Sequence, residues 1–302
     1  MKKVVITGAT GFIGRHCLTS LVAKGYDVHA ICKSSHADSS AGVEWHATNL
    51  LDPSSVESLF ATVRPSHLLH FAWCTTPGEY WTSRENLHWV QASLNIVQSF
   101  AAFGGQRVVM AGTSAEYLWN SEHYSEQGTP LEPATLYGTS KHALHLMVDA
   151  FCKQASVSNA WGRIFFLYGP YEHPQRLVAS VIYSLLRGEP ARCSEGNQVR
   201  DFLYVEDVAD AFTSVLDAEA TGAINIGSGK ATMVREIVDS IGRILNRRPL
   251  IQFGALPRPD NDPPSVVADV RKLERIGWSP RWTLEAGLTR TIDWWKRELR
   301  IS

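Results

Sequence analysis

The stretch Val4-Val5-Ile6-Thr7-Gly8-Ala9-Thr10-Gly11-Phe12-Ile13-Gly14 decides the fold of this 302-residue chain. Its β-branched start predicts a short strand, and the residues after the turn predict a helix. Glycines at positions 8, 11 and 14 leave the turn between them free of side chains. Backbone N–H groups and the helix dipole can then meet the pyrophosphate of a dinucleotide. A glycine turn that serves packing alone is the alternative interpretation.

Outward from this turn, short β-branched runs alternate with helical stretches. The segments are Lys3–Thr7, Gly11–Lys24, Asp27–Ile31, Pro53–Val63, His67–Phe71, Glu85–Phe103 and Arg107–Gly112. Such alternation predicts parallel strands joined by right-handed helical crossovers. We therefore expect an α/β fold with a Rossmann-type, doubly wound parallel sheet.

The alternation loosens after a further predicted strand at Ala160–Leu167. We expect residues 1–165 to form an NAD(P)-binding domain, with segments near 200–228 returning to its sheet. Residues 166–302 are expected to form a smaller, mixed α/β lobe that binds substrate and is interleaved with the first domain.

Composition and charge exclude several classes of protein. Hydrophobic residues make up 44% of the chain and its net charge is −1, which argues against a nucleic-acid-binding surface. The five cysteines are scattered, so we expect reduced thiols and assign no metal site. No apolar run reaches the roughly 18 residues of a membrane span, and Met1-Lys2-Lys3 leads directly into a strand. We expect a cytoplasmic protein without membrane contact.

The end of the second predicted strand bears on the choice of dinucleotide. An acidic residue there would bind a ribose 2′-hydroxyl, whereas a basic one would accept a 2′-phosphate. The sequence is Ile31-Cys32-Lys33-Ser34, without a carboxylate. Lys33 and Ser34 therefore favour NADP(H), with NAD(H) as the alternative; a solvated lysine is the simpler interpretation of Lys33.

Further positions complete the predicted cofactor site. Arg15 is a candidate second phosphate partner, and Asn49 and Leu50 follow the third strand, where they could flank the adenine. A lone asparagine in a loop is as often only a turn residue. The remaining predicted contacts are Thr10, Phe12, Ile13, Phe71 and Ala72.

A phenol and an ammonium lie four residues apart in Leu136-Tyr137-Gly138-Thr139-Ser140-Lys141, and on a helix they share one face. A nearby positive charge favours phenolate and lowers a tyrosine pKa from about 10. Proton transfer near neutral pH then becomes feasible. Taken alone, the pair is a weak signal and is more often an exposed helix turn.

Taken together, these motifs resemble the extended short-chain dehydrogenase/reductases that act on nucleotide sugars. The resemblance covers almost the whole chain. Besides the glycine turn and the Tyr137–Lys141 pair, it is carried by Asn86, Ala111-Gly112-Thr113-Ser114, Tyr168-Gly169-Pro170, Arg200-Asp201-Phe202, Asn225-Ile226-Gly227 and Ala268-Asp269.

The resemblance implies roles for individual residues. Tyr137 would exchange a proton with a sugar oxygen, Lys141 would hold the nicotinamide ribose, and Thr113 would hydrogen-bond the reacting oxygen. Arg200 and Arg258 match positions that bind substrate phosphates, although either could form a surface ion pair. Weaker substrate candidates are Arg176 and Ser114. Four aromatic residues lie in loops expected beside the sugar, although core packing explains each of them equally well: Trp73, Tyr80, Trp81 and Trp119.

Two departures from the family pattern limit the chemistry. The position of the dehydratase glutamate is Ala115, and Glu116 beside it would point to the opposite face of a continuing strand. Dehydration is therefore disfavoured. The usual asparagine two residues before Tyr168-Gly169-Pro170 is Phe166, which removes a family hydrogen bond to the substrate.

With dehydration disfavoured, two reactions remain that Thr113, Tyr137 and Lys141 could catalyse together. Lys33 favours an NADPH-dependent reductase of a nucleotide-linked keto-sugar, most simply a 4-keto-6-deoxyhexose. An NAD-dependent nucleotide-sugar epimerase is the alternative, and a non-catalytic dinucleotide-binding regulator is disfavoured because it need not keep the three residues together. The family also implies a homodimer through helices around Glu85–Phe103 and Ser140–Phe151, whose apolar content is equally consistent with packing within one chain.

Overall fold

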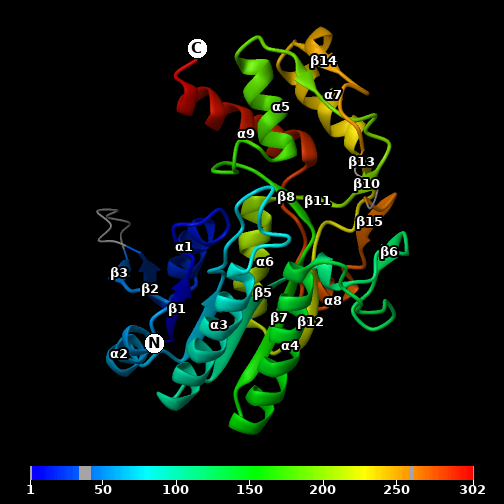
Figure 1. The fold of residues 1–302 in the computed structure, drawn as a ribbon. Coiled ribbons are helices and arrows are strands. Elements are labelled where there is room, and N and C mark those ends of the chain that lie inside the picture. Colours follow the sequence, from blue (N-terminus) through cyan, green and yellow to red (C-terminus); the bar gives the residue numbers. More distant parts are fainter. Residues whose placement is uncertain (1, 34–41, 259–261, 302) are drawn as a thin grey trace.

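A computed structural model of the protein describes residues 2–33, 42–258 and 262–301. Ser34, one of the predicted cofactor contacts, lies outside the described residues. Figure 1 shows a parallel sheet flanked by helices, with a second group of elements above its upper edge.

The main sheet holds seven parallel strands in the order β12-β7-β5-β4-β1-β2-β3. Because the chain moves outward from β1 in one direction and then from β4 in the other, the strand order reverses between them. Ligands of doubly wound sheets bind beyond the carboxyl ends of strands at such a point. The bounds are β1 (Lys3–Thr7), β2 (Asp27–Cys32), β3 (Val43–Ala47), β4 (His67–His70), β5 (Arg107–Thr113), β7 (Ser158–Ile164) and β12 (Gly222–Ile226).

Helices cover both faces of this sheet (Figure 1). The side chains of β1 alternate between two cores: Val4 and Ile6 join the core beneath α1 and α6, whereas Val5 joins the core beneath α2, α3 and α4. A strand buried on both faces reads as a continuous apolar run, as Val4-Val5-Ile6 does. The bounds are α1 (Gly14–Ala23), α2 (Pro53–Val63), α3 (Glu85–Ala102), α4 (Leu136–Ala155) and α6 (Val205–Asp217).

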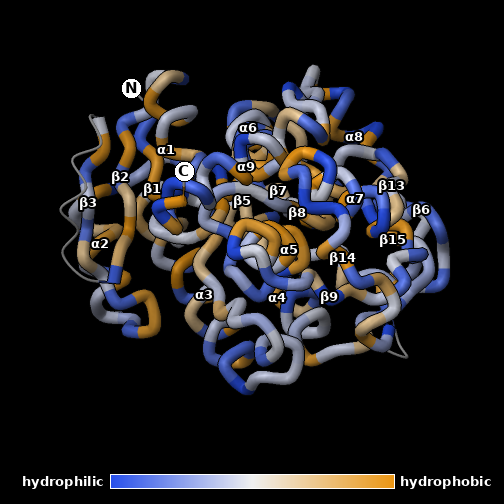
Figure 2. Tube along the Cα trace, turned by 90° about the horizontal axis from the view of Figure 1, so that it is seen from above, coloured by the Kyte–Doolittle hydropathy of each residue, from blue (hydrophilic) through white to orange (hydrophobic). Residues whose placement is uncertain are grey.

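The elements above the sheet form a third core. Helices α5 (Leu177–Leu186), α7 (Val234–Ile244) and α9 (Leu284–Leu299) pack together there, and Figure 2 shows α5 as a largely apolar helix. A second sheet has the order β13-β10-β15-β6, and two strand pairs, β11-β8 and β14-β9, complete this part. The strands are β6 (His123–Tyr124), β8 (Phe166–Tyr168), β9 (Ala191–Arg192), β10 (Val199–Arg200), β11 (Phe202–Tyr204), β13 (Thr232–Met233), β14 (Ile251–Gln252) and β15 (Ser265–Ala268). The remaining helical turns are η1 (Ser114–Glu116), η2 (Arg248–Leu250) and α8 (Arg271–Glu274).

The predicted Rossmann-type fold is confirmed by the seven-stranded sheet. The single strand expected at Ala160–Leu167 is two strands, because β7 ends at Ile164 and β8 leaves the sheet to pair with β11. β12 pairs with β7 in the main sheet, and α6 packs against α1. The domain boundary near residue 165 stays a prediction. None of the described helices is long and apolar enough to cross a membrane.

Candidate active site

The glycine turn joins β1 to α1 at the reversal point of the sheet. Gly8 has a φ of +66°, and a Cβ there would lie 2.9 Å from the Ala72 nitrogen. A Cβ on Gly14 would clash with the Gly8 carbonyl oxygen. Packing therefore requires glycine at both positions, whether or not a ligand binds at the turn. Helix α1 begins without a side-chain N-cap, although the Arg15 and His16 nitrogens donate to the Gly11 and Ile13 carbonyls. No side chain blocks the helix start, so the turn fits a dinucleotide pyrophosphate.

The other predicted cofactor residues lie in different environments. Lys33 is exposed directly after β2. The Asn49 side chain accepts a hydrogen bond from the Leu51 nitrogen, as a turn residue does, and Leu50 is buried in the core beneath α2. The Arg15 guanidinium stacks 3.7 Å from the centre of the Tyr171 ring and donates to the Thr10 and Gly11 carbonyls. Arg15 is thus held at the turn itself.

Thr113, Tyr137 and Lys141 come together at the end of β5 and the start of α4. Thr113 is the last residue of β5, and its hydroxyl accepts a hydrogen bond from the Ala115 nitrogen. Thr135 caps α4 by accepting from the Gly138 nitrogen, which fixes the turn that carries Tyr137. Both Thr113 and Tyr137 are 9% exposed, and Thr113 is close enough to the Tyr137 phenol to lower its pKa. The two hydroxyl side chains are therefore buried neighbours, and the buried Lys141 follows one helical turn after Tyr137.

The protonation of this group differs from the sequence expectation. Burial is the main factor that raises the pKa of Tyr137, the neighbouring Tyr80 adds to it, and Thr113 offsets the rise only in part. Lys141 is not among the groups that act on the Tyr137 pKa in this structure, so its lowering of that pKa stays a prediction and burial sets the direction. The Lys141 ammonium instead donates to the Ala111 carbonyl at 2.9 Å and lies 3.7 Å from the centre of the Trp73 ring. Burial lowers its pKa to about 7.

Aromatic side chains cover the phenol. The Tyr80 ring meets the Tyr137 ring edge-on with centroids 4.9 Å apart, and Trp81 does so at 5.7 Å. Trp119 stands beside Trp81 and donates from its indole to the Ser114 carbonyl at 3.0 Å. These rings exclude water from Tyr137, which is the physical cause of its raised pKa.

Two polar residues hold the aromatic side chains around Tyr137 in place. The Asn86 amide donates to the carbonyls of Tyr80 and Ser83, while its oxygen accepts from the Trp73 indole at 2.9 Å. Arg176 is the N-cap residue of α5, and its guanidinium donates to the Tyr80 hydroxyl at 3.4 Å. Arg176, the weaker substrate candidate, is therefore brought to the covered site.

Glu116 is directed away from the phenol, but strand alternation is not the cause, because β5 ends at Thr113 and Glu116 lies in the helical turn η1. It is fully buried and accepts from the Thr113 nitrogen at 2.9 Å, from the Trp161 indole at 2.8 Å and from Arg163 at 2.9 Å. The carboxylate is therefore committed to holding the end of β5. Ala115 packs with Tyr80 and Tyr137 in one apolar cluster, so a methyl group lies where a dehydratase needs a carboxylate.

The structure also brings Arg200 and Arg258 together. Both guanidinium groups bind Asp262, and Arg258 reaches its carboxylate at 3.3 Å. Arg200 is 3% exposed and lies 5.2 Å above the Phe166 ring, so the residue that replaces the family asparagine packs against this arginine. Sequence reasoning missed Asp262, although an acid four residues after Arg258 was the available signal.

Comparisons with known proteins identify the family of the chain. Residues 4–227 match the NAD dependent epimerase/dehydratase family. The chain belongs to this family. It is 29% identical to UDP-glucuronic acid decarboxylase 1 from Danio rerio, over 99% of this chain and 73% of that protein. The resemblance inferred from the sequence is thereby confirmed.

Solved structures of the epimerase/dehydratase family superpose on nearly the whole chain. One is UDP-glucose 4-epimerase from Thermus thermophilus in complex with NAD, with 25% identity, a TM-score of 0.84, and 97% of this chain and 99% of that chain covered. Another is MoeE5 in complex with UDP-glucuronic acid and NAD, with 28% identity, a TM-score of 0.85, and coverage of 98% and 99%.

Other motifs that carried the resemblance to the epimerase/dehydratase family hold the chain together. The Asp201 carboxylate accepts N–H bonds from Ser228, Gly229 and Ala268. A Cβ on Gly227 would lie 2.7 Å from this carboxylate. These motif residues thus join three segments that lie far apart in the sequence.

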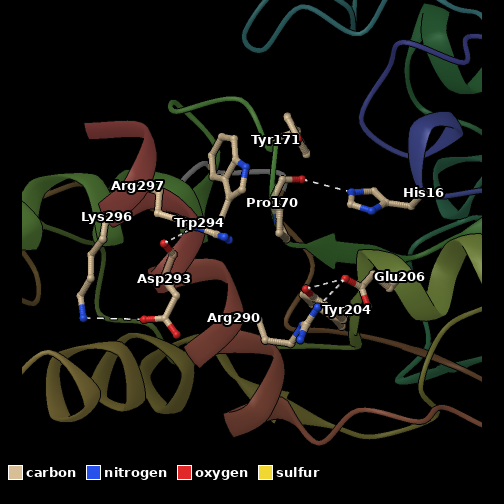
Figure 3. A pocket seen from close by; sticks show the side chains of 10 residues that line it. All are labelled: His16, Pro170, Tyr171, Tyr204, Glu206, Arg290, Asp293, Trp294, Lys296 and Arg297. Carbon is tan, nitrogen blue, oxygen red and sulfur yellow. Dashed lines mark hydrogen bonds and ion pairs between the residues drawn. The ribbon is translucent and has the colours of Figure 1, made fainter. Parts of the chain in front are cut away.

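A hollow of about 650 Å³ lies between His16 of α1 and side chains of α9 (Figure 3). The imidazole of His16 is 3.4 Å from the Pro170 carbonyl there, and Arg290 binds Glu206. The hollow is lined by His16, Pro170, Tyr171, Tyr204, Glu206, Arg290, Asp293, Trp294, Lys296 and Arg297. None of the three predicted catalytic residues lines it.

Proposed function

We propose that this protein moves a hydride between a nicotinamide dinucleotide and a hydroxyl-bearing or keto carbon of a nucleotide sugar. The observation that carries the proposal is the buried pair of neighbouring hydroxyl side chains, Thr113 and Tyr137, with Lys141 buried one helical turn further on. When bound at the glycine turn, the dinucleotide supplies or accepts the hydride. The chain itself positions the sugar oxygen and handles its proton.

The two hydroxyls divide this work. Because burial raises its pKa, Tyr137 is protonated near neutral pH and can donate its proton to a sugar oxygen as that oxygen gains charge. In the reverse direction the same oxygen of Tyr137 takes the proton back. Thr113 donates a hydrogen bond to the reacting oxygen, in a site from which aromatic rings exclude water.

Epimerisation is the first candidate for the net reaction. It removes and returns a hydride and needs no group beyond Thr113, Tyr137 and Lys141. The similar 4-epimerase from Thermus thermophilus and MoeE5 are both named as complexes with NAD, which supports NAD as the cofactor here. The same relatives support a UDP-sugar as the substrate. Ala115 beside Tyr137 argues against water elimination, because its methyl group cannot remove a proton.

Reduction of a keto-sugar by NADPH is the second candidate. It rests on one observation, the exposed Lys33 directly after β2, at the position that reads the ribose 2′-substituent. Arg200 and Arg258 serve either reaction by binding the diphosphate of the substrate, for which Asp262 would have to release them.

Net consumption of the cofactor distinguishes epimerisation from reduction. The protein is incubated with UDP-glucose or UDP-glucuronic acid and catalytic NAD, and separately with a 4-keto-6-deoxy sugar nucleotide and NADPH. Products are followed by NMR and reduced cofactor by absorbance. An epimer formed without net cofactor change supports epimerisation, and stoichiometric NADPH loss supports reduction. If Tyr137→Phe turned over as fast as the unaltered protein in whichever reaction is observed, the proposed chemistry would be wrong.

A further inference from the structure

A cluster of two histidines and a glutamate lies at the edge of the main sheet, away from the candidate active site. His29 is on β2, and Glu44 and His46 are on β3, the edge strand (Figure 1). The parallel register pairs His29 with Glu44 and Ile31 with His46, so all three side chains project from one face. His29 Nδ1 lies 2.8 Å from His46 Nε2. The Glu44 carboxylate oxygens lie 3.5 Å from His46 Nε2 and 3.7 Å from His29 Nδ1.

We propose that His29, Glu44 and His46 bind a divalent late transition-metal ion, with Zn²⁺ as the best fit. Imidazole nitrogen and carboxylate oxygen bind zinc at about 2.0–2.2 Å in a tetrahedron, which separates the ligand atoms by about 3.3 Å. The two distances to Glu44 are already close to this value, and the two imidazoles need to separate only slightly. Glu44 is exposed, which leaves the fourth position open to water.

The environment of His29 supports coordination through its Nδ1 atom. The side chain is 5% exposed, and its buried Nε2 atom makes no hydrogen bond in the described structure but lies 3.4 Å from the Asp27 carboxylate. A histidine that binds a metal commonly directs its other nitrogen at a carboxylate, which fixes the tautomer and orients the ring. Asp27 would hold the Nε2 proton, so that the Nδ1 lone pair faces His46 and Glu44. Lys3, 3.8 Å from Asp27, is the nearby opposing charge.

A metal ion could reach the cluster from the space between β3 and α2. A hollow of about 630 Å³ opens there, and His46 lines it together with hydroxyl side chains of α2. The second His/Glu group in the described part of the chain, Glu116 with His142 and His145, makes a poorer site, because Arg163 already neutralises Glu116. The β2–β3 cluster has no arginine bound to its carboxylate among the described ion pairs.

Bound metal would join two neighbouring strands that are consecutive in the sequence. β2 ends at Cys32, directly before Lys33, and β3 begins at Val43. A metal bridge between His29 and His46 would therefore fasten the sheet edge next to the predicted cofactor-binding residue. We expect this bridge to raise thermal stability, because a ligand that binds only the folded state shifts unfolding toward higher temperature.

Titration with Co²⁺, which reports tetrahedral coordination by its visible absorption, tests the site. The full-length protein, free of any affinity tag and stripped with chelator, should bind about one Co²⁺ per chain, and Zn²⁺ should displace it. His46→Gln and Glu44→Gln should abolish the Co²⁺ bands and the rise in melting temperature with Zn²⁺. His88→Gln is the matched control, since His88 is exposed on α3 and paired only with Glu85; it should bind metal unchanged.

Two results would overturn the proposal. One is the absence of stoichiometric Co²⁺ and Zn²⁺ binding to the unaltered protein, which would mean that His29 and His46 only share a hydrogen bond. The other is binding that survives His46→Gln. Melting temperatures of the metal-free variants establish that they are folded. No substrate is used, so the outcome is independent of the proposed catalytic function.

Discussion

The two ends of the candidate active site differ in what surrounds their ionisable side chains. At the reacting end, Tyr137 and Lys141 are buried among aromatic rings, and burial moves their pKa values toward the neutral forms. At the other end, Arg200 and Arg258 both bind the Asp262 carboxylate, which offsets part of the lowering of the Arg200 pKa by burial. Burial favours the neutral form of an ionisable group, whereas ion pairing stabilises the charged form. The first keeps a proton on the Tyr137 phenol, and the second keeps cationic groups for a diphosphate.

The largest effect is expected from Tyr137→Phe at the reacting end. Loss of the proton donor should lower kcat by about 10²- to 10⁴-fold, the usual size of general acid–base catalysis. The affinity for the nucleoside diphosphate should not change, because that ligand binds at the other end. Steady-state kinetics and calorimetric titration with UDP measure the two effects. Tyr183→Phe, on α5 beside Trp295, is the matched control and should behave as the unaltered protein.

The comparison would fail if Tyr137→Phe weakened UDP binding as much as it slowed turnover. That result would mean that the phenol serves to shape the whole substrate groove.

Arg200→Gln tests the other end and should give the next largest effect. A charge-assisted hydrogen bond is worth about 1.5–3 kcal/mol, so UDP affinity should fall by roughly 10- to 150-fold while kcat at saturating substrate changes little. Calorimetric titration measures the affinity. Arg192→Gln, at an exposed arginine that donates to the Ala255 carbonyl, is the control and should leave it unchanged. A fall in kcat at unchanged UDP affinity would assign Arg200 to the reacting end.

Stability against pH should reveal the burial of Lys141. Its pKa is about 7 in the folded chain against 10.5 when free, so between these values the unfolded chain carries a proton that the folded chain lacks. Stability from this group should therefore rise with pH over that window, by at most about 1.4 kcal/mol per pH unit, and its destabilising effect is fully present below pH 7.

Urea denaturation of the unaltered protein and of Lys141→Met at several pH values measures this slope. The gain in stability from Lys141→Met should be larger near pH 7 than near pH 10. Lys230→Met, at an exposed lysine, should keep the slope of the unaltered protein. Parallel curves for Lys141→Met and the unaltered protein would show that the ammonium stays charged at neutral pH.

The smallest effect is expected from Lys33→Ala at the cofactor edge. An exposed lysine contributes no more than about 1 kcal/mol, so NADPH affinity should fall only several-fold, with NADH affinity unchanged. The difference should shrink as salt is added. Fluorescence titration with both cofactors measures it, and Lys230→Ala is the control. Equal losses for NADPH and NADH would remove the only support for an NADP preference.

Much of the candidate site followed from local patterns. The glycine spacing after Val4-Val5-Ile6 predicted the β1–α1 turn, and the period of four placed Tyr137 and Lys141 on one face of α4. The direction of the Tyr137 pKa could not be predicted in this way. It depends on Tyr80 and Trp81, which come from a loop more than fifty residues earlier in the chain and remove water from the phenol.

Pairings across long distances in the sequence were also missed. Asp262 binds an arginine 62 positions earlier, and His29 meets His46 only because β2 and β3 lie side by side in register. Neither pairing leaves a periodic signal in the chain.

By itself, the sequence determined the sheet, the order of its crossovers and the residues carried at strand ends, because backbone geometry turns local spacing into faces and edges. The tertiary structure alone decided which of those residues are protonated, which are already paired and which meet across strands. Protonation depends on how much water surrounds a group, and pairing depends on which segments pack together. Neighbours in space set both.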